Sequence, residues 1–149
     1  MIKRLSIEDK EAIKQLFCSV FTREPWNDDW SDEQQLDSYI IDLIGCHNSL
    51  TYGMYEDGQL VGLSMGLIKH WYMGTEYYIN ELCILTEKQG MGLGARFIDE
   101  ISAELIADGI NHIFLLTDRS VPAYNFYKKL GFRELTDTVA FVRNLEPAE

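Results

Sequence analysis

The stretch LTEKQGMGLGARF, residues 85–97, decides the fold of this chain. It places Gly90, Gly92 and Gly94 behind a polar run and in front of a segment with helical hydrophobic periodicity. A glycine-rich turn that runs into a helix presents backbone N–H groups and the positive end of the helix dipole, so it favours phosphate binding. Several unrelated cofactors carry phosphate, and the flanking sequence must distinguish between them.

The flanks of this turn show alternating strand and helix patterns. The predicted elements begin with a strand at 2–5, a helix capped by Ser6 and a helix opened by a capping box of Ser31 and Gln34. Three antiparallel strands follow at 50–55, 60–72 and 76–85. A helix from 93, a strand at 111–117, a short helix at 121–130 and two strands at 132–135 and 138–144 complete the order. The strand at 111–117 is apolar over its central residues 113–116 and is most simply the parallel return of a βαβ crossover.

This order predicts an α/β (α+β) fold with a mixed, mostly antiparallel central sheet of about seven strands and helices on both faces. The chain has 149 residues, of which 46% are hydrophobic, which favours a single domain over residues 1–149. Its longest apolar run, at 60–68, is too short to span a membrane, and the N-terminal residues lack a secretory pattern. We therefore expect a cytoplasmic protein.

The chain is strongly acidic, with 24 acidic against 13 basic residues and a formal net charge of -11. Such a surface disfavours nucleic acid and anionic lipid and favours cationic partners. Part of the acid is concentrated between Glu24 and Asp37, which indicates either a solvated helix start or the mouth of a site for a polyamine-like substrate. Three cysteines without a C-x-x-C pair and three scattered histidines predict neither disulfides nor a metal site.

Two short motifs suggest other functions but lack the expected context. Gly90, Gly92 and Ala95 satisfy the G-x-G-x-x-G/A pattern of dinucleotide-binding proteins, yet four polar residues separate the preceding strand from the first glycine. Residues 62–66, GLSMG, spell a nucleophile elbow around Ser64, but they lie inside an apolar strand and not at a strand-to-helix turn. Glycines in such a strand indicate close approach of a neighbouring group.

Taken with both flanks, the glycine turn closely resembles that of the GNAT superfamily of acetyl-CoA-dependent N-acetyltransferases. Gln89, Gly92 and Gly94 match the family pattern [Gln/Arg]-x-x-Gly-x-[Gly/Ala]. The later segment SVPAYNFYKKLGF, residues 120–132, matches the family's Asn-x-x-Ala-x-x-x-Tyr motif with Gly-Phe following, except that Ser120 replaces the asparagine. The predicted element order also agrees with that fold, so the resemblance spans nearly the whole chain.

The resemblance implies that acetyl-CoA is the cofactor and that the acetyl group passes to an amine by direct attack in a ternary complex. Backbone groups of the strand end and the glycine turn would hold coenzyme A, together with the later motif. The implied cofactor-binding residues are Cys83, Ile84, Leu85, Gln89, Gly90, Met91, Gly92, Leu93, Gly94, Ala95, Ser120 and Tyr127.

Two residues are candidates for catalysis. Tyr127 matches the family tyrosine that protonates the leaving thiolate, although a tyrosine on an amphipathic helix can also serve packing alone. Glu81 lies in an otherwise apolar strand, two residues before Cys83 and therefore on the same face. A carboxylate there has either a proton to accept from the amine, directly or through water, or a structural partner to bind.

The acceptor site is expected near the two N-terminal helices and their loop, which contains EPWNDDW. Aromatic rings there could hold a cation while carboxylates bind further amines. The candidate substrate-binding residues are Glu24, Trp26, Asp28, Trp30, His70, Tyr72 and Asn80. We predict a small polycationic amine, polyamine-like or aminoglycoside-like, with a protein or peptide amine as the next choice and a noncatalytic acyl-CoA-binding regulatory domain as the rival. The sequence is compatible with a homodimer but carries no signal for oligomeric state.

Overall fold

The computed structural model describes residues 1–146, and it groups the chain into two compact units. The first unit is Met1–Leu116, and the second begins at Thr117. A single domain over residues 1–149 stays a prediction.

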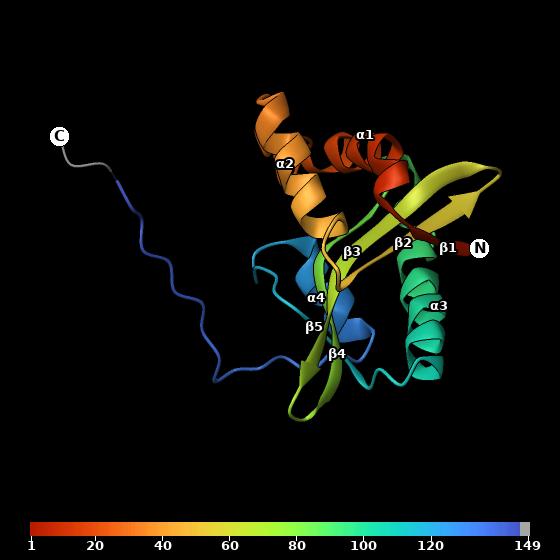
Figure 1. Ribbon diagram of the computed structural model, residues 1–149, viewed down its shortest axis with the longest axis vertical. Coiled ribbons are helices and arrows are strands. Elements are labelled where there is room, and N and C mark those ends of the chain that lie inside the picture. Colours follow the sequence, from red (N-terminus) through yellow and green to blue (C-terminus); the bar gives the residue numbers. More distant parts are fainter. Residues whose placement is uncertain (147–149) are drawn as a thin grey trace. The chain divides into compact units, whose positions relative to one another are not determined.

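The first unit is built on a sheet of five strands in the order β1-β2-β3-β4-β5 (Figure 1). The strands are β1 (Ile2–Leu5), β2 (Ser49–Glu56), β3 (Gln59–Trp71), β4 (Gly74–Ile84) and β5 (His112–Leu115). The first four pair antiparallel, and β5 runs parallel to β4. The predicted meander and the parallel return after the crossover helix are both confirmed.

Three α-helices accompany this sheet: α1 (Lys10–Phe21), α2 (Glu33–Ile44) and α3 (Leu93–Ala107). Ser6 caps the first helical segment as predicted, because its hydroxyl accepts from the N–H of Glu8 in a short 3-10 turn ahead of α1. The predicted Ser31 cap of α2 is wrong. Asp32 caps α2 by accepting from two backbone N–H groups, and the N–H of Ser31 turns to Asp29.

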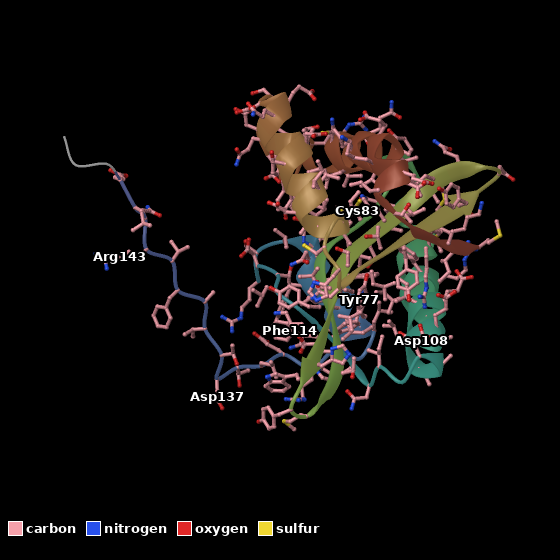
Figure 2. The ribbon with its side chains drawn as sticks, viewed as in Figure 1. Tyr77, Cys83, Asp108, Phe114, Asp137 and Arg143 are labelled. Carbon is pink, nitrogen blue, oxygen red and sulfur yellow. The ribbon has the colours of Figure 1, made fainter. Side chains whose placement is uncertain are left out.

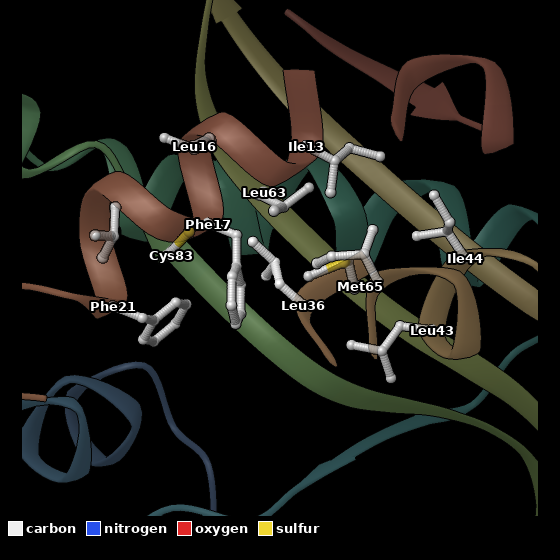
Figure 3. Close-up of a cluster of buried hydrophobic side chains, with 12 residues drawn as sticks. Ile13, Leu16, Phe17, Phe21, Leu36, Leu43, Ile44, Leu63, Met65 and Cys83 are labelled. Atoms are coloured by element: carbon white, nitrogen blue, oxygen red, sulfur yellow. The ribbon is translucent and has the colours of Figure 1, made fainter. Parts of the chain in front are cut away.

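One face of the sheet packs against α1 and α2, and Figure 3 shows the side chains between them. Ile13, Leu16 and Phe17 of α1 meet the sheet residues Leu63 and Met65 in this buried cluster. Cys83 of β4 belongs to the same cluster, so its side chain lies on the face of the sheet that α1 and α2 cover.

The other face of the sheet packs against α3. A Cβ atom on Gly62 would lie 3.3 Å from the ring of Phe97, so the helix approaches β3 closely there. Ser64 points to the same face, is fully buried, and its Oγ lies 2.9 Å from the hydroxyl of Tyr77. A Cβ atom on Gly66 would lie 2.5 Å from the Tyr77 ring. The strand interpretation of residues 62–66 is confirmed, and Ser64 has a structural role.

The second unit contains α4 (Pro122–Lys129) and an extended C-terminal segment. The predicted strands at 132–135 and 138–144 do not form in the described residues, so the sheet has five strands and not about seven. Near the first of them, Glu134 binds Arg119 at 2.8 Å and Tyr124 at 2.7 Å through its carboxylate. The segment predicted as the second strand, 138–144, has no neighbouring strand among residues 1–146 with which its backbone groups could pair. No helix of the described residues is long and apolar enough to cross a membrane.

Candidate active site

The edge of β4 that faces β5 is only half covered. β5 pairs with β4 along Glu76–Ile79, and this pairing ends at Leu115. On its other side β4 stays paired with β3 as far as Ile84. Residues 80–84 therefore have one open edge, with no strand of the described residues beside it. An open edge of this kind offers unpaired N–H and C=O groups to an extended ligand.

The direction of the backbone along this edge follows from one hydrogen bond. The N–H of Leu85 donates to the carbonyl of Val61 at 2.7 Å, so Leu85 and, by alternation, Cys83 turn their backbone groups to β3. The intervening residues Leu82 and Ile84 turn theirs to the open edge. Of the three predicted strand residues, only Ile84 faces that way. Leu82 was missed because the alternation can be assigned only once the strand pairing is known.

The glycine turn follows the open edge directly. Gly90 and Gly92 adopt φ values of 80° and 79°, which residues with a Cβ atom rarely adopt. The side chain of Gln89 donates to the carbonyl of Ile84 at 3.0 Å, so it ties the turn to the end of β4. These contacts fix the path of the chain from the strand into α3.

The start of α3 fits an anionic ligand. No side chain among residues 1–146 caps its N-terminus at Gly92, and its first turn contains no acidic residue. The first N–H groups of a helix have no partner within it, and a Cβ atom on Gly90 or Gly92 would meet open space. Of the other predicted residues in this turn, Met91 is exposed, Gly94 and Ala95 are half-buried, and the Leu93 side chain is buried, so Leu93 can offer only its backbone.

Glu81 lies at the open edge, on the same face of β4 as Cys83. The strand has a bulge there: Glu81 pairs with Met65 and Ile79 pairs with Gly66, so Asn80 is the extra residue. Burial raises the pKa of the Glu81 carboxyl, and a 2.6 Å hydrogen bond from the hydroxyl of Tyr39 opposes this shift. The result is a partly buried carboxylate held in one position.

An aromatic cluster surrounds the Tyr39 side chain. Trp30 stacks on Tyr39 with ring centroids 5.2 Å apart and an interplanar angle of 18°, and its edge meets Phe17. Trp26 packs edge-on against Phe21 at 5.2 Å. Both tryptophans are therefore half-buried packing residues, and one face of Trp30 is already covered. Tyr39 was missed, although its place three residues after the inward-facing Leu36 was a usable signal.

The acidic loop between α1 and α2 contributes charge to this cluster. Glu24 and Asp28 are both exposed, and the N–H of Asp28 donates to the carbonyl of Phe21 at 2.9 Å. The negative charge of Asp28 raises the pKa of both Glu81 and Tyr39. The structure thus brings Asp28, Trp30 and Glu81 into one electrostatic neighbourhood, with Tyr39 at its centre.

Two predicted acceptor residues lie elsewhere in the first unit. His70 pairs with Thr75 near the β3–β4 hairpin, six positions from Glu81 along β4, which corresponds to roughly 20 Å of strand. Tyr72 is in the hairpin itself and is 84% exposed. Asn80 is adjacent to Glu81, and its side-chain oxygen is buried without a hydrogen-bond partner among the described residues.

The remaining predicted site residues belong to the second unit. Tyr127 lies in α4, where its ring contacts Phe126 at 5.2 Å and Phe132 at 5.3 Å between centroids. Its backbone carbonyl accepts from the N–H of Phe132 at 3.1 Å. Ser120 is exposed and precedes the N-cap of α4, which is Val121.

Solved structures of known proteins have the same fold. An aminoglycoside acetyltransferase from an uncultured soil metagenomic sample, solved with sisomicin, is 22% identical, with a TM-score of 0.75 over 98% of this chain and 96% of that one. A ribosomal-protein-alanine N-acetyltransferase from Brucella melitensis is 16% identical, with a TM-score of 0.74 over 97% and 99%. A possible acetyltransferase from Clostridium difficile 630 is 13% identical, with a TM-score of 0.81 over 98% of both chains.

The family follows from the sequence match and not from these structures alone. No curated protein matches this chain significantly. The model of the acetyltransferase (GNAT) family matches residues 10–132, which include the glycine turn, Glu81 and the motif around Tyr127. The chain therefore belongs to the GNAT acetyltransferase family and is an acyltransferase.

Proposed function

We propose that this chain transfers the acetyl group of acetyl-CoA to a primary amine by direct attack in a ternary complex, and that the acceptor is a small polycationic amine. The observation that carries the proposal is the open edge of β4 at residues 80–84, because it leads from the Glu81 carboxylate to the glycine turn. A cytoplasmic location and a small-molecule partner are part of the proposal.

The first unit supplies two kinds of group for the cofactor. The backbone groups of Leu82 and the N–H of Ile84, whose carbonyl already accepts from Gln89, offer hydrogen bonds to an extended amide-containing arm, as an added strand would receive. The uncapped N-terminus of α3 and the positive-φ glycines offer N–H donors to a pyrophosphate. These local donors act at short range, whereas the net charge of -11 is spread over the chain and screened by salt. Bound acetyl-CoA would supply the thioester.

Glu81 is proposed as the group that accepts the proton of the attacking amine, directly or through water. A base works best when its pKa lies near the working pH, and burial shifts the pKa of Glu81 upward from its ordinary value. Tyr39 holds the carboxylate in place through the 2.6 Å hydrogen bond. Tyr127 is proposed as the proton donor to the leaving thiolate, on the strength of its motif position.

The acceptor class is inferred from charge and from one structural neighbour. Asp28 acts electrostatically on Tyr39, and both Asp28 and Glu24 are exposed in the loop that carries Trp30, so additional ammonium groups of an acceptor would find carboxylates there. The sisomicin-bound neighbour acts on aminoglycosides, which are polyamines, and this supports the choice. A protein amine is the second candidate, because another neighbour is a ribosomal-protein-alanine N-acetyltransferase.

A thiol-release assay with acetyl-CoA tests cofactor and acceptor together. Spermidine and sisomicin should react with higher kcat/KM than a monoamine of similar size or an arylamine. Glu81→Gln should lower kcat on the order of 100-fold for every acceptor, as loss of a general base does. Faster reaction of neutral or monocationic amines would contradict the acceptor class. Undiminished rates in both Glu81→Gln and Tyr127→Phe would contradict the assigned chemistry. A wild type that binds acetyl-CoA but acetylates no amine would favour the noncatalytic alternative.

A further inference from the structure

One ion pair joins the loop between α1 and α2 to the segment ahead of the glycine turn. Nη1 of Arg23 donates to Oε1 of Glu87 at 2.8 Å, although the two residues are 64 positions apart in the chain. Arg23 is the only lysine or arginine between Lys14 and Lys69, and the acidic residues of its own loop lie much closer to it in the sequence. The single basic side chain of this loop therefore connects it to another part of the first unit.

The Glu87 end of the ion pair belongs to the proposed cofactor side. Glu87 is the middle residue of a 3-10 turn, Thr86–Lys88, that lies directly ahead of the glycine turn. The N–H groups of Lys88 and Gln89 each donate to the carbonyl three residues earlier, at 2.8 and 3.2 Å. Residues 85–89 thus form one compact turn, and a ligand that fixes the backbone from Gly90 onward also restricts Glu87.

The Arg23 end organises the loop of the proposed acceptor site. The carbonyl of Arg23 accepts from the N–H groups of Trp26 at 3.1 Å and Asn27 at 2.9 Å, and the N–H of Asp28 returns to the end of α1. The loop is therefore wound around Arg23. Its residue Asp28 acts electrostatically on Glu81. A contact that holds Arg23 consequently also holds the backbone that carries the acceptor-side carboxylate.

We propose that the Arg23–Glu87 ion pair couples the two ligand sites, so that coenzyme A on the glycine turn strengthens the binding of a polycationic acceptor beside Asp28. This inference rests on the proposed function. A ligand on the turn restricts Glu87 and, through the ion pair, the loop around Arg23, so that acceptor binding then costs less conformational entropy. The coupling is reciprocal, because the acceptor must strengthen coenzyme A binding by the same factor. Arg23 is thus a positioning residue.

The charges of the two partners separate this coupling from simple attraction. Arg23 neutralises Glu87, which lies three positions before Gly90 and therefore near the proposed pyrophosphate site. Without Arg23 the carboxylate repels a bound pyrophosphate, whereas without Glu87 the free guanidinium attracts it. Loss of one partner or the other should therefore have opposite effects on coenzyme A affinity but the same effect on the coupling.

The test measures spermidine affinity by calorimetry with and without saturating coenzyme A, which carries no acetyl group and cannot react. In the wild type, coenzyme A should tighten spermidine binding by about two- to fivefold, which is the range for one exposed ion pair. Arg23→Gln and Glu87→Gln should each abolish this ratio. Coenzyme A alone should bind Arg23→Gln more weakly and Glu87→Gln more tightly. The charge-exchanged double variant, Arg23→Glu with Glu87→Arg, should restore the ratio.

Matched controls come from an exposed ion pair at the other end of α3. Arg4 pairs with Asp108, which follows the last residue of that helix and is labelled in Figure 2. The Arg4 side chain is 55% exposed, against 53% for Arg23. Arg4→Gln and Asp108→Asn change the net charge by the same amounts, and the 15 residues of α3 separate them from the glycine turn. Both variants should keep the wild-type ratio.

The alternative results are distinct. Wild type that binds both ligands, with the same spermidine affinity in the presence and absence of coenzyme A, would overturn the coupling and leave the proposed function standing. A ratio retained in both Arg23→Gln and Glu87→Gln would assign the coupling to other contacts. A ratio that stays abolished in the charge-exchanged variant would show that the two positions do not act as a pair. Failure of wild type to bind spermidine or coenzyme A would contradict the proposed function, and the coupling with it.

Discussion

The hydroxyl of Tyr39 donates a 2.6 Å hydrogen bond to the carboxylate of Glu81 and thereby joins helix α2 to the open part of β4. This bond favours the charged form of Glu81, while burial and the charge of Asp28 favour the neutral form. The protonation of the proposed base therefore depends on opposing contributions that can be removed one at a time.

Removal of the Tyr39 hydroxyl should move the acid limb of the pH–rate profile upward. In Tyr39→Phe the carboxylate loses its donor, the pKa of Glu81 rises further, and a higher pH is needed to deprotonate it. The measurement is kcat/KM against pH with one acceptor. Tyr55→Phe, which removes a half-buried tyrosine hydroxyl on β2, is the control and should leave the profile in place. An unmoved acid limb in Tyr39→Phe would mean that Glu81 does not limit the rate.

Neutralisation of Asp28 should have the opposite effect. Asp28→Asn removes a negative charge that raises the pKa of Glu81, so the acid limb should move to lower pH. KM for spermidine should rise severalfold, while KM for a monoamine should change less. Asp42→Asn, an exposed acid on the same helix as Tyr39, is the matched control. Equal changes for Asp28→Asn and Asp42→Asn would attribute the effect to net charge alone.

The raised pKa of Glu81 also predicts how stability depends on pH. Between the ordinary carboxyl pKa and the raised folded value, the folded state binds more protons than the unfolded state, so unfolding free energy falls as pH rises through this window. Glu81→Gln should abolish that fall. Glu87 contributes with the opposite sign, because the hydrogen bond from Arg23 lowers its pKa and the wild type loses this stabilisation as pH falls. Glu87→Gln should abolish that loss. Denaturant unfolding across the acid range checks both signs.

Substitution in the glycine turn should weaken cofactor binding while it destabilises the fold no more than a matched substitution elsewhere. Gly92→Ala places a Cβ atom at a φ of 79° and should cost about 1 kcal/mol of stability. Gly58→Ala, in the β2–β3 turn, is a matched control with a φ of 77° and equally open surroundings. Calorimetry should show weaker acetyl-CoA binding in Gly92→Ala alone. Equal affinity in the two variants would remove the glycine turn from the cofactor site.

The two tyrosines of α4 separate a chemical role from a structural one. Tyr127→Phe should lower kcat on the order of 100-fold if its hydroxyl protonates the thiolate. Tyr124→Phe loses the 2.7 Å bond to Glu134 and should lower the melting temperature with little effect on kcat. Stopped-flow measurement of thiol release gives both rates. A normal rate in Tyr127→Phe would assign that tyrosine to packing.

The sequence predicted what depends on local periodicity and local motifs. The meander, the crossover helix at Leu93 and the glycine turn ahead of it are all decided by residues close in the chain. The cap of α2 was assigned one residue too early, because Ser31 and Asp32 are both good capping residues and only geometry separates them. The strand at 138–144 was predicted from its own pattern, but a strand also needs a neighbour, and a pattern does not supply one.

The site was predictable only in part, for the same reason. Glu81 stood out as a carboxylate in an apolar strand, and its position at the open edge agrees with that interpretation. Tyr39 and Leu82 were missed because their roles depend on which helix packs on the strand and which backbone groups face outward. His70 and Tyr72 were grouped with Glu81 although a long hairpin separates them.

The bulge at Asn80 inverts the sidedness of β4. Tyr77 precedes it and faces α3, whereas Cys83, also an odd-numbered residue, faces α1 and α2. Because of this one extra residue, side chains of β4 pack on both faces of the sheet, and the Glu81 side chain lies on the face covered by α1 and α2. Substitution of Asn80 should consequently be tolerated far better than its deletion, since the number of residues at this point, more than their identity, sets the side of the sheet on which the chemistry is proposed to take place.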